Sequence, residues 1–134
     1  MSSMIDGQGP AAFKHAINVN ATGDTEIAIP NAGRYYTVRR FLVTGADADL
    51  SGGSLQYGLF SATGGGGEAI VSNGVNSATS LTSATKYVAP TIAQNDYINA
   101  SSIYFRVGTA NGAAATVKVY VFVDYLPSVN VTVT

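Results

Sequence analysis

The chain contains no cysteine and no tryptophan, and only 11% of its 134 residues are charged. The absence of cysteine excludes disulfide bonds, thiolate metal sites and cysteine nucleophiles, and it favours folding in a reducing cytoplasm. Ordinary globular domains carry about 25% charged residues. A surface so poor in charge suits a protein that is covered by neighbours; a neutral coat of serine, threonine and glycine is the alternative.

Signals for export, membrane insertion and nucleic-acid binding are also lacking. The first ten residues have neither a basic nor an apolar stretch, so they are not a signal peptide. No apolar run approaches the roughly 20 residues that a membrane helix needs. The seven Lys and Arg residues are scattered, and the only adjacent pair, Arg39-Arg40, would point to opposite faces of a strand. We therefore expect no membrane partner and no nucleic-acid partner.

Catalytic motifs are equally scarce. His15 is the only histidine, so a histidine-based metal site cannot form within one chain. We interpret it as a partly buried structural residue on a strand face with Phe13 and Ile17. No Gly-x-Ser-x-Gly motif occurs. The glycine run at 64–67 lacks a following Lys-Ser/Thr pair, and it therefore predicts a flexible hairpin tip and not a phosphate loop.

Asp47 and Asp49 are the one pair of carboxylates that a loop brings together, and such oxygens suit calcium. No bidentate glutamate follows at the spacing of a calcium loop, so we interpret both as polar turn residues. The sequence predicts a protein that is not an enzyme and that uses no cofactor and no metal.

What the sequence does contain is period-two alternation in short runs, separated by Gly, Asn and Pro. This pattern predicts an all-β fold, an antiparallel β-sandwich of about eight strands. We expect an extended arm at 1–12 and a single domain at 13–134, with one helical turn near 78–85. The runs at 102–107 and 115–124 predict a hairpin. The expected strands are 12–19, 25–29, 34–44, 54–61, 68–71, 86–88, 102–107, 115–124 and 129–134.

Alternation also divides the strands into faces. In 34–44 it places Arg40 with Leu42 and Arg39 with Phe41, so one arginine must lie beside apolar neighbours. In 115–124 the face with Tyr120 and Phe122 is too aromatic for a face open only to water. The predicted core comprises Val38, Leu42, Leu55, Leu59, Ile103, Phe105, Val117, Val119 and Val121.

Three runs carry a resemblance: Tyr35 to Thr44, Gly58 to Val71, and Tyr104 to Phe122. Across residues 34–123 the chain resembles small structural proteins of tailed bacteriophages and prophages, namely the head decoration or cement proteins. The resemblance implies a sandwich of jelly-roll type, often trimeric, that clamps neighbouring subunits of the major capsid protein. It implies a virion protein made in the host cytoplasm, and it carries over no functional residue.

We therefore expect a non-enzymatic virion protein that stabilises the capsid. The alternative is a receptor- or carbohydrate-binding module of a phage fibre or tail, with sugars bound on a tyrosine-lined loop. The arm and the last strand are the expected partner contacts, through Met4, Ile5, Val129, Val131 and Val133. A disordered arm, and a last strand that completes its own sheet, are the alternatives.

Overall fold

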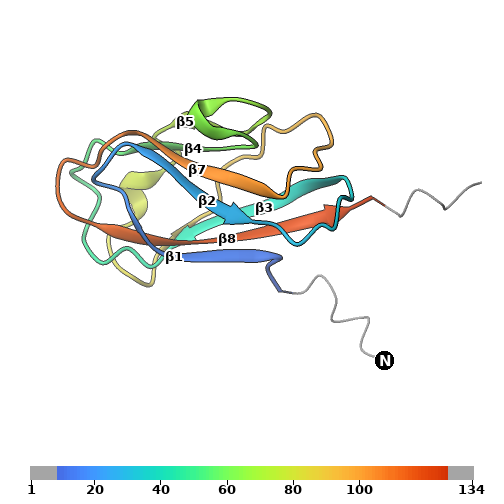
Figure 1. The fold of residues 1–134 in the computed structure, drawn as a ribbon. Coiled ribbons are helices and arrows are strands. Elements are labelled where there is room, and N and C mark those ends of the chain that lie inside the picture. Colours follow the sequence, from blue (N-terminus) through green and yellow to red (C-terminus); the bar gives the residue numbers. More distant parts are fainter. Residues whose placement is uncertain (1–8, 127–134) are drawn as a thin grey trace, which may run out of the picture.

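The computed structural model describes residues 9–126, which form two stacked four-stranded antiparallel sheets (Figure 1). Sheet A contains, in spatial order, β1 (Ala12–Asn18), β8 (Thr116–Tyr125), β3 (Tyr36–Thr44) and β6 (Tyr87–Val88). Sheet B contains β2 (Gly23–Ala28), β7 (Ser102–Thr109), β4 (Gln56–Phe60) and β5 (Ala69–Gly74). The predicted all-β sandwich of about eight strands is confirmed.

Helical structure is confined to loops between the strands. The short 3₁₀ turns η2 (Thr63–Gly65) and η3 (Ala78–Ser80) are the helical elements of the described part of the chain. The turn η3 falls within the range where the sequence predicts a helical turn. No helix within residues 9–126 has the length and hydrophobicity to cross a membrane.

The strand order is that of a long hairpin rolled into two layers. β4 pairs with β5, β3 with β6, β2 with β7 and β1 with β8, and successive pairs alternate between the sheets. Eight strands nested in this way, in two sheets, make a jelly roll. Each inner strand then has a neighbour on both sides, so backbone groups pair along most of its length.

The predicted hairpin of 102–107 with 115–124 is wrong. β7 lies in sheet B between β2 and β4, whereas β8 lies in sheet A between β1 and β3. The glycine-containing loop after β7 therefore crosses from one sheet to the other. Alternation and a short loop are local signals. They look the same whether the second strand pairs with the first or crosses to the facing sheet.

The core fills the space between the two sheets. Eight of the nine predicted core residues are buried. Phe105 of β7 is fully buried, and its ring contacts Phe41 of β3 across the layers at 6.1 Å between centroids and Tyr57 of β4 at 5.3 Å. These three rings join sheet A to sheet B at the centre of the molecule.

Leu42 is the ninth residue, and its predicted burial is wrong. A β-bulge interrupts the pairing of β3 with β8 between Val38 and Arg40. The extra residue reverses the alternation, so Phe41 and Val43 turn inward while Leu42 is half-buried on the outside. The same bulge leaves Arg39 and Arg40 both exposed. Strict alternation would have placed one of them among core side chains, and neither lies there.

A second irregularity corrects the interpretation of His15. The register of β1 against β8 shifts between Lys14 and Ile17, and Ala16 has a positive φ of 56°. Ile17 consequently turns into the core, while Phe13 and His15 stay on the exposed side. His15 is therefore an exposed residue and not a partly buried one.

The described chain enters and leaves at one end of sheet A. The Ala11 amide donates to the Val121 carbonyl at 2.8 Å and β1 starts at Ala12, so the end of the predicted arm already belongs to the sheet. Ala12 is paired with Val121, close to the end of β8, and Figure 1 shows both ends on the same side. The predicted contacts Met4, Ile5, Val129, Val131 and Val133 and the strand 129–134 lie outside the described residues.

Replacing Phe105 with alanine should lower the free energy of unfolding by about 3–5 kcal/mol, because burial is lost and a cavity is left between the sheets. Leu42→Ala is the matched control, since Leu42 is half-exposed, and it should cost less than about 1 kcal/mol. Urea denaturation of both variants measures the difference. Similar losses for the two would contradict the assignment of faces in β3 and β7.

Alkali should destabilise the fold through two buried tyrosines. Burial raises the pKa of Tyr57, whose hydroxyl donates to the Asn76 carbonyl. Burial also raises the pKa of Tyr36, and the nearby Tyr125 adds a smaller increase. Because the unfolded pKa is lower, near 10, the stabilisation is complete below that pH and falls as the pH rises above it. The free energy of unfolding should drop between pH 9 and 11 by less in Tyr57→Phe than in the parent chain. An equal drop in both would refute this role for Tyr57.

Candidate functional site

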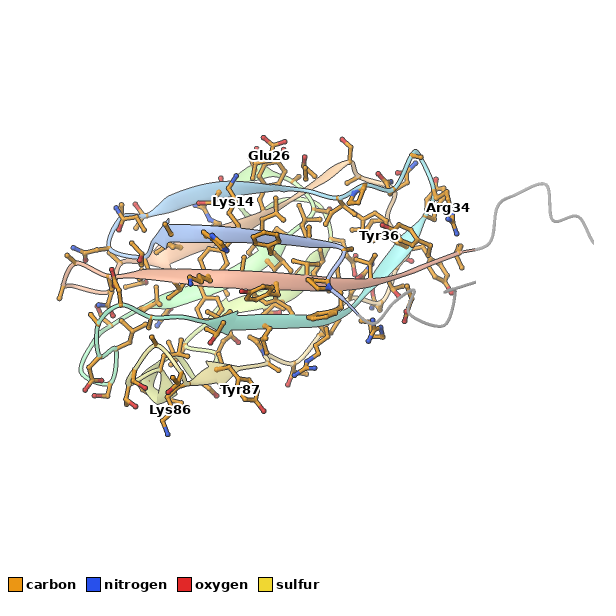
Figure 2. The ribbon with its side chains drawn as sticks, turned by 90° about the horizontal axis from the view of Figure 1, so that it is seen from below. Lys14, Glu26, Arg34, Tyr36, Lys86 and Tyr87 are labelled. Carbon is orange, nitrogen blue, oxygen red and sulfur yellow. The ribbon has the colours of Figure 1, made fainter. Side chains whose placement is uncertain are left out.

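The outer face of sheet A carries a grid of aromatic and basic side chains. Strand register places Phe13 of β1, Tyr120 of β8 and Leu42 of β3 in one row across the sheet. The next row pairs Phe122 with Arg40, and a third pairs Lys118 with Thr44 and Thr44 with Tyr87 of β6. Figure 2 looks onto this face, with Tyr87 at the β6 edge. We call it the aromatic–arginine face: Phe13, Arg39, Arg40, Leu42, Tyr87, Tyr120 and Phe122.

Four of the five large apolar side chains that are exposed among the described residues lie on sheet A or at its end. Among the described residues, five large apolar side chains are exposed, and Phe13 (54%) and Tyr87 (60%) belong to the face. Tyr35 and Tyr97 flank a bridge between Tyr36 and Ile98 at the end of sheet A. Since Tyr36 points inward, alternation places these two rings outward. The fifth, Val75, follows β5 in sheet B.

Phe122 is the centre of the face. The guanidinium groups of Arg39 and Arg40 each lie 5.7 Å from its ring centroid, within the range of a cation–π contact. Arg39 also forms an ion pair with Asp124 at 3.1 Å. The bulge in β3 creates this arrangement, because it brings two consecutive arginines to the same side of the strand.

The neighbouring rings pack on one another. Phe13 stacks on Tyr120 with 5.8 Å between centroids, and His15 lies 4.8 Å from Phe13. The side chain of Lys118 lies against Gly45 at the β3 end of the row. Phe13, Tyr120 and Phe122 are thus packed against neighbouring side chains of the face.

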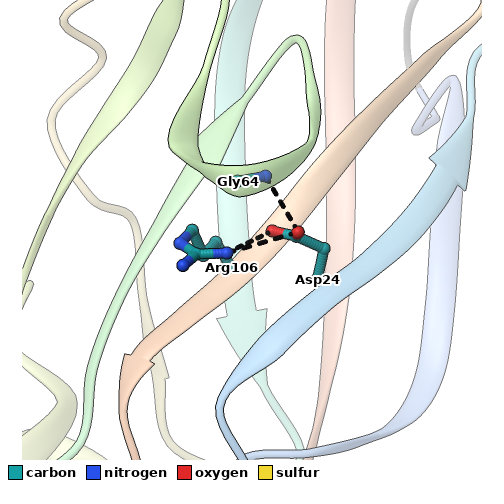
Figure 3. A network of polar contacts seen from close by, with 3 residues as sticks. All are labelled: Asp24, Gly64 and Arg106. Carbon is teal, nitrogen blue, oxygen red and sulfur yellow. Dashed lines mark hydrogen bonds and ion pairs between the residues drawn. The ribbon is translucent and has the colours of Figure 1, made fainter.

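Sheet B has a different outer surface. The Asp24 carboxylate of β2 accepts from Arg106 of β7 at 3.2 Å and from the Gly64 amide at 3.0 Å (Figure 3). The glycine run predicted as a hairpin tip does connect β4 with β5, and this contact ties it down over sheet B. The ion pair and the turn together cover part of the sheet with polar and backbone groups.

Among the described residues, two open hollows lie away from the aromatic–arginine face. One of about 410 Å³ lies between β2, β7 and η2, where Glu26 accepts from the Ser102 hydroxyl. The other, of about 480 Å³, is lined by loop residues that include Asp49, Gly53 and Asn111. His15 lies on the opposite sheet from the first hollow, so the structure does not assemble a histidine–carboxylate pair there.

The two aspartates considered for calcium serve as loop anchors. Hydrogen bonds donated by the Thr116 amide and hydroxyl, at 2.8 and 3.0 Å, lower the pKa of Asp47. Hydrogen bonds from Ser51 likewise lower the pKa of Asp49. Within residues 9–126 no three acidic or histidine side chains lie close enough to hold a metal ion.

A scan against protein-family models and searches of curated proteins and of solved structures found no match. Sequence reasoning identified the aromatic side of β8 but missed its partners on β1, β3 and β6. One signal was available: two adjacent arginines in an otherwise apolar strand require a bulge if both are to reach water.

Proposed function

We propose that this chain is a non-enzymatic structural protein that binds the surface of a viral particle and stabilises its shell. The observation that carries the proposal is the aromatic–arginine face, which exposes packed rings and guanidinium groups on a rigid sheet. Protein interfaces are enriched in Tyr, Phe and Arg at their centres, with lysine depleted there. Lys14 and Lys86 stand at the β1 and β6 edges of sheet A (Figure 2), which fits this composition, whereas Lys118 is the one lysine on an inner strand of the sheet.

The fold and the sequence support the viral setting by analogy. Jelly rolls of eight strands occur in viral capsid proteins as well as in lectin domains, and fold alone does not decide between such functions. The resemblance of residues 34–123 to phage head decoration proteins favours the capsid. In that setting the partner is the major capsid protein or another virion protein, and the chain acts as a homo-oligomer, with a trimer as the favoured state.

The face is too small to act alone. Strand geometry gives it a footprint of about 20 by 15 Å, or about 300 Å², whereas a stable interface covers about 800 Å² per partner. The two terminal segments join the described domain beside this face, at the end of sheet A that contains Ala12 and Tyr125. Contacts through Met4, Ile5, Val129, Val131 and Val133 would extend the interface on that side.

Stabilisation then follows from mass action. A copy that touches two neighbouring shell subunits binds the closed shell and not the separated subunits, so its binding free energy adds to the stability of the closed state. This mechanism needs no catalytic group, and it needs many copies on each particle.

A second candidate is a carbohydrate-binding module of a fibre or tail. The exposed rings of Phe13 and Tyr87 favour it, because flat aromatic surfaces bind sugars as well as proteins. A glycan array probed with the isolated domain tests this candidate directly. Binding of a defined glycan that is lost in Tyr87→Ser would favour it over the capsid proposal.

Quantitative mass spectrometry of purified particles should find hundreds of copies of the chain on each, because decoration follows the repeat of the shell. A fibre or tail module would be present in few copies. Recovery of the chain in the particle-free fraction alone would refute the proposal.

Replacing both Phe13 and Tyr87 with serine should reduce occupancy on particles at least tenfold, since two exposed rings at an interface contribute about 1 kcal/mol or more each. Val75→Ser is the matched control, because it removes an exposed apolar side chain that lies off the face, and its occupancy should be unchanged. Deleting residues 2–10 tests the arm in the same assay. Full binding by the folded truncation would remove the arm from the mechanism.

A further inference from the structure

The charges that stand on strands are divided unequally between the two sheets, although they are scattered along the sequence, whereas Asp47, Asp49, Glu68 and Asp96 lie in loops. Four cations and one acid, Asp124, stand on the strands of sheet A. The strands of sheet B instead carry two acids, Asp24 and Glu26, and one cation. The cations of sheet A are Lys14, Arg39, Arg40 and Lys118; in addition, Lys86 directly precedes β6 and Arg34 lies two residues before the start of β3. The net charge of −1 conceals this separation.

The cations of sheet A lack acidic partners in the described chain, apart from the pair of Arg39 with Asp124. Arg106, the one cation on the sheet B strands, is paired with Asp24 at 3.2 Å. For Arg40 and Lys118, both exposed, residues 9–126 provide no carboxylate within ion-pair distance. Both side chains lie on the aromatic–arginine face or beside it, opposite Phe122 and Thr44.

From these cations without acidic partners, which lie among exposed rings, we infer that the aromatic–arginine face binds an acidic protein surface. On that surface, carboxylates alternate with apolar side chains. The inference rests on the proposed function and names the chemistry of its partner. Guanidinium groups bind carboxylates in a bidentate way, so Arg40 would receive an acid from the partner while the rings of Phe13 and Tyr120 receive apolar groups. Complementary charges of this kind determine specificity and the rate of association.

The geometry favours a protein over single-stranded nucleic acid. Nucleic-acid platforms present free ring faces on which bases stack. Here Phe122 is flanked by two guanidinium groups and Phe13 is stacked on Tyr120, so these rings already have partners. The opposite sheet of a second copy is also a poor match, because the Asp24–Arg106 pair and the turn at Gly64 cover it with polar groups.

The probe for the test is a fluorescein-labelled peptide of alternating glutamate and tyrosine, compared with its lysine–tyrosine counterpart and with oligothymidylate. Fluorescence anisotropy should show binding of the glutamate peptide that weakens as salt is added. Arg40→Gln should raise its Kd about tenfold, equivalent to about 1.4 kcal/mol. Arg40→Glu should shift the preference toward the lysine peptide. Arg106→Gln is the control on sheet B and should bind as the parent chain does, with thermal melts to confirm folding.

Three results would overturn the inference: equal binding of both peptides without salt dependence, tighter binding of oligothymidylate, or no binding of the glutamate peptide. The proposed function is tested separately by the occupancy of the Phe13 and Tyr87 double variant on particles. If that occupancy falls while the two peptides bind equally well, the face docks on protein but charge does not select the partner. If the occupancy of the double variant on particles is unchanged, the proposed function itself fails.

Discussion

The β-bulge between Val38 and Arg40 is the constraint on which both the core and the exposed face of sheet A depend. Without an extra residue, strict alternation would bury one of the two arginines among apolar side chains, and an unpaired buried charge costs several kcal/mol. With the bulge, Val38 and Phe41 both turn inward. Phe41 then meets Phe105 across the layers, while both arginines reach Phe122 on the outside. One local irregularity therefore determines the contact between the sheets and the chemistry of the surface.

The rolled arrangement of the strands extends this separation to the whole molecule. Because successive strand pairs alternate between the sheets, distant parts of the sequence come together in one layer: β1 and β8, from opposite ends of the described chain, are neighbours. Phe13 and Tyr120 meet only for this reason. The same nesting brings the bases of β1, β3 and β8 into sheet A, on whose strands Asp124 is the single acid.

Alternation predicted the strands and eight of the nine core residues, because burial on one side of a strand leaves a period of two in the sequence. It failed at Leu42 and His15, where an inserted residue changes the phase of the pattern. It also failed for the predicted hairpin of β7 with β8, since the pattern within a strand does not depend on which strands lie beside it. The unequal division of charge between the sheets could not be predicted for the same reason: Lys14, Arg40 and Lys118 are far apart in the sequence and come into one sheet only after the strands are paired.

An exposed aromatic surface is a liability for a free protein, since it promotes self-association. The arginines restrain this tendency here. In a symmetric dimer formed through the aromatic–arginine face, each residue would meet the same patch of the other copy. Arg40 and Lys118 would then face a surface of like charge, and the single acid, Asp124, is already paired with Arg39. Like charges opposed across an interface are unfavourable. The face is therefore disfavoured as a contact between copies, and any homo-oligomer would use other surfaces, which leaves the rings and guanidinium groups open to a different, acidic partner.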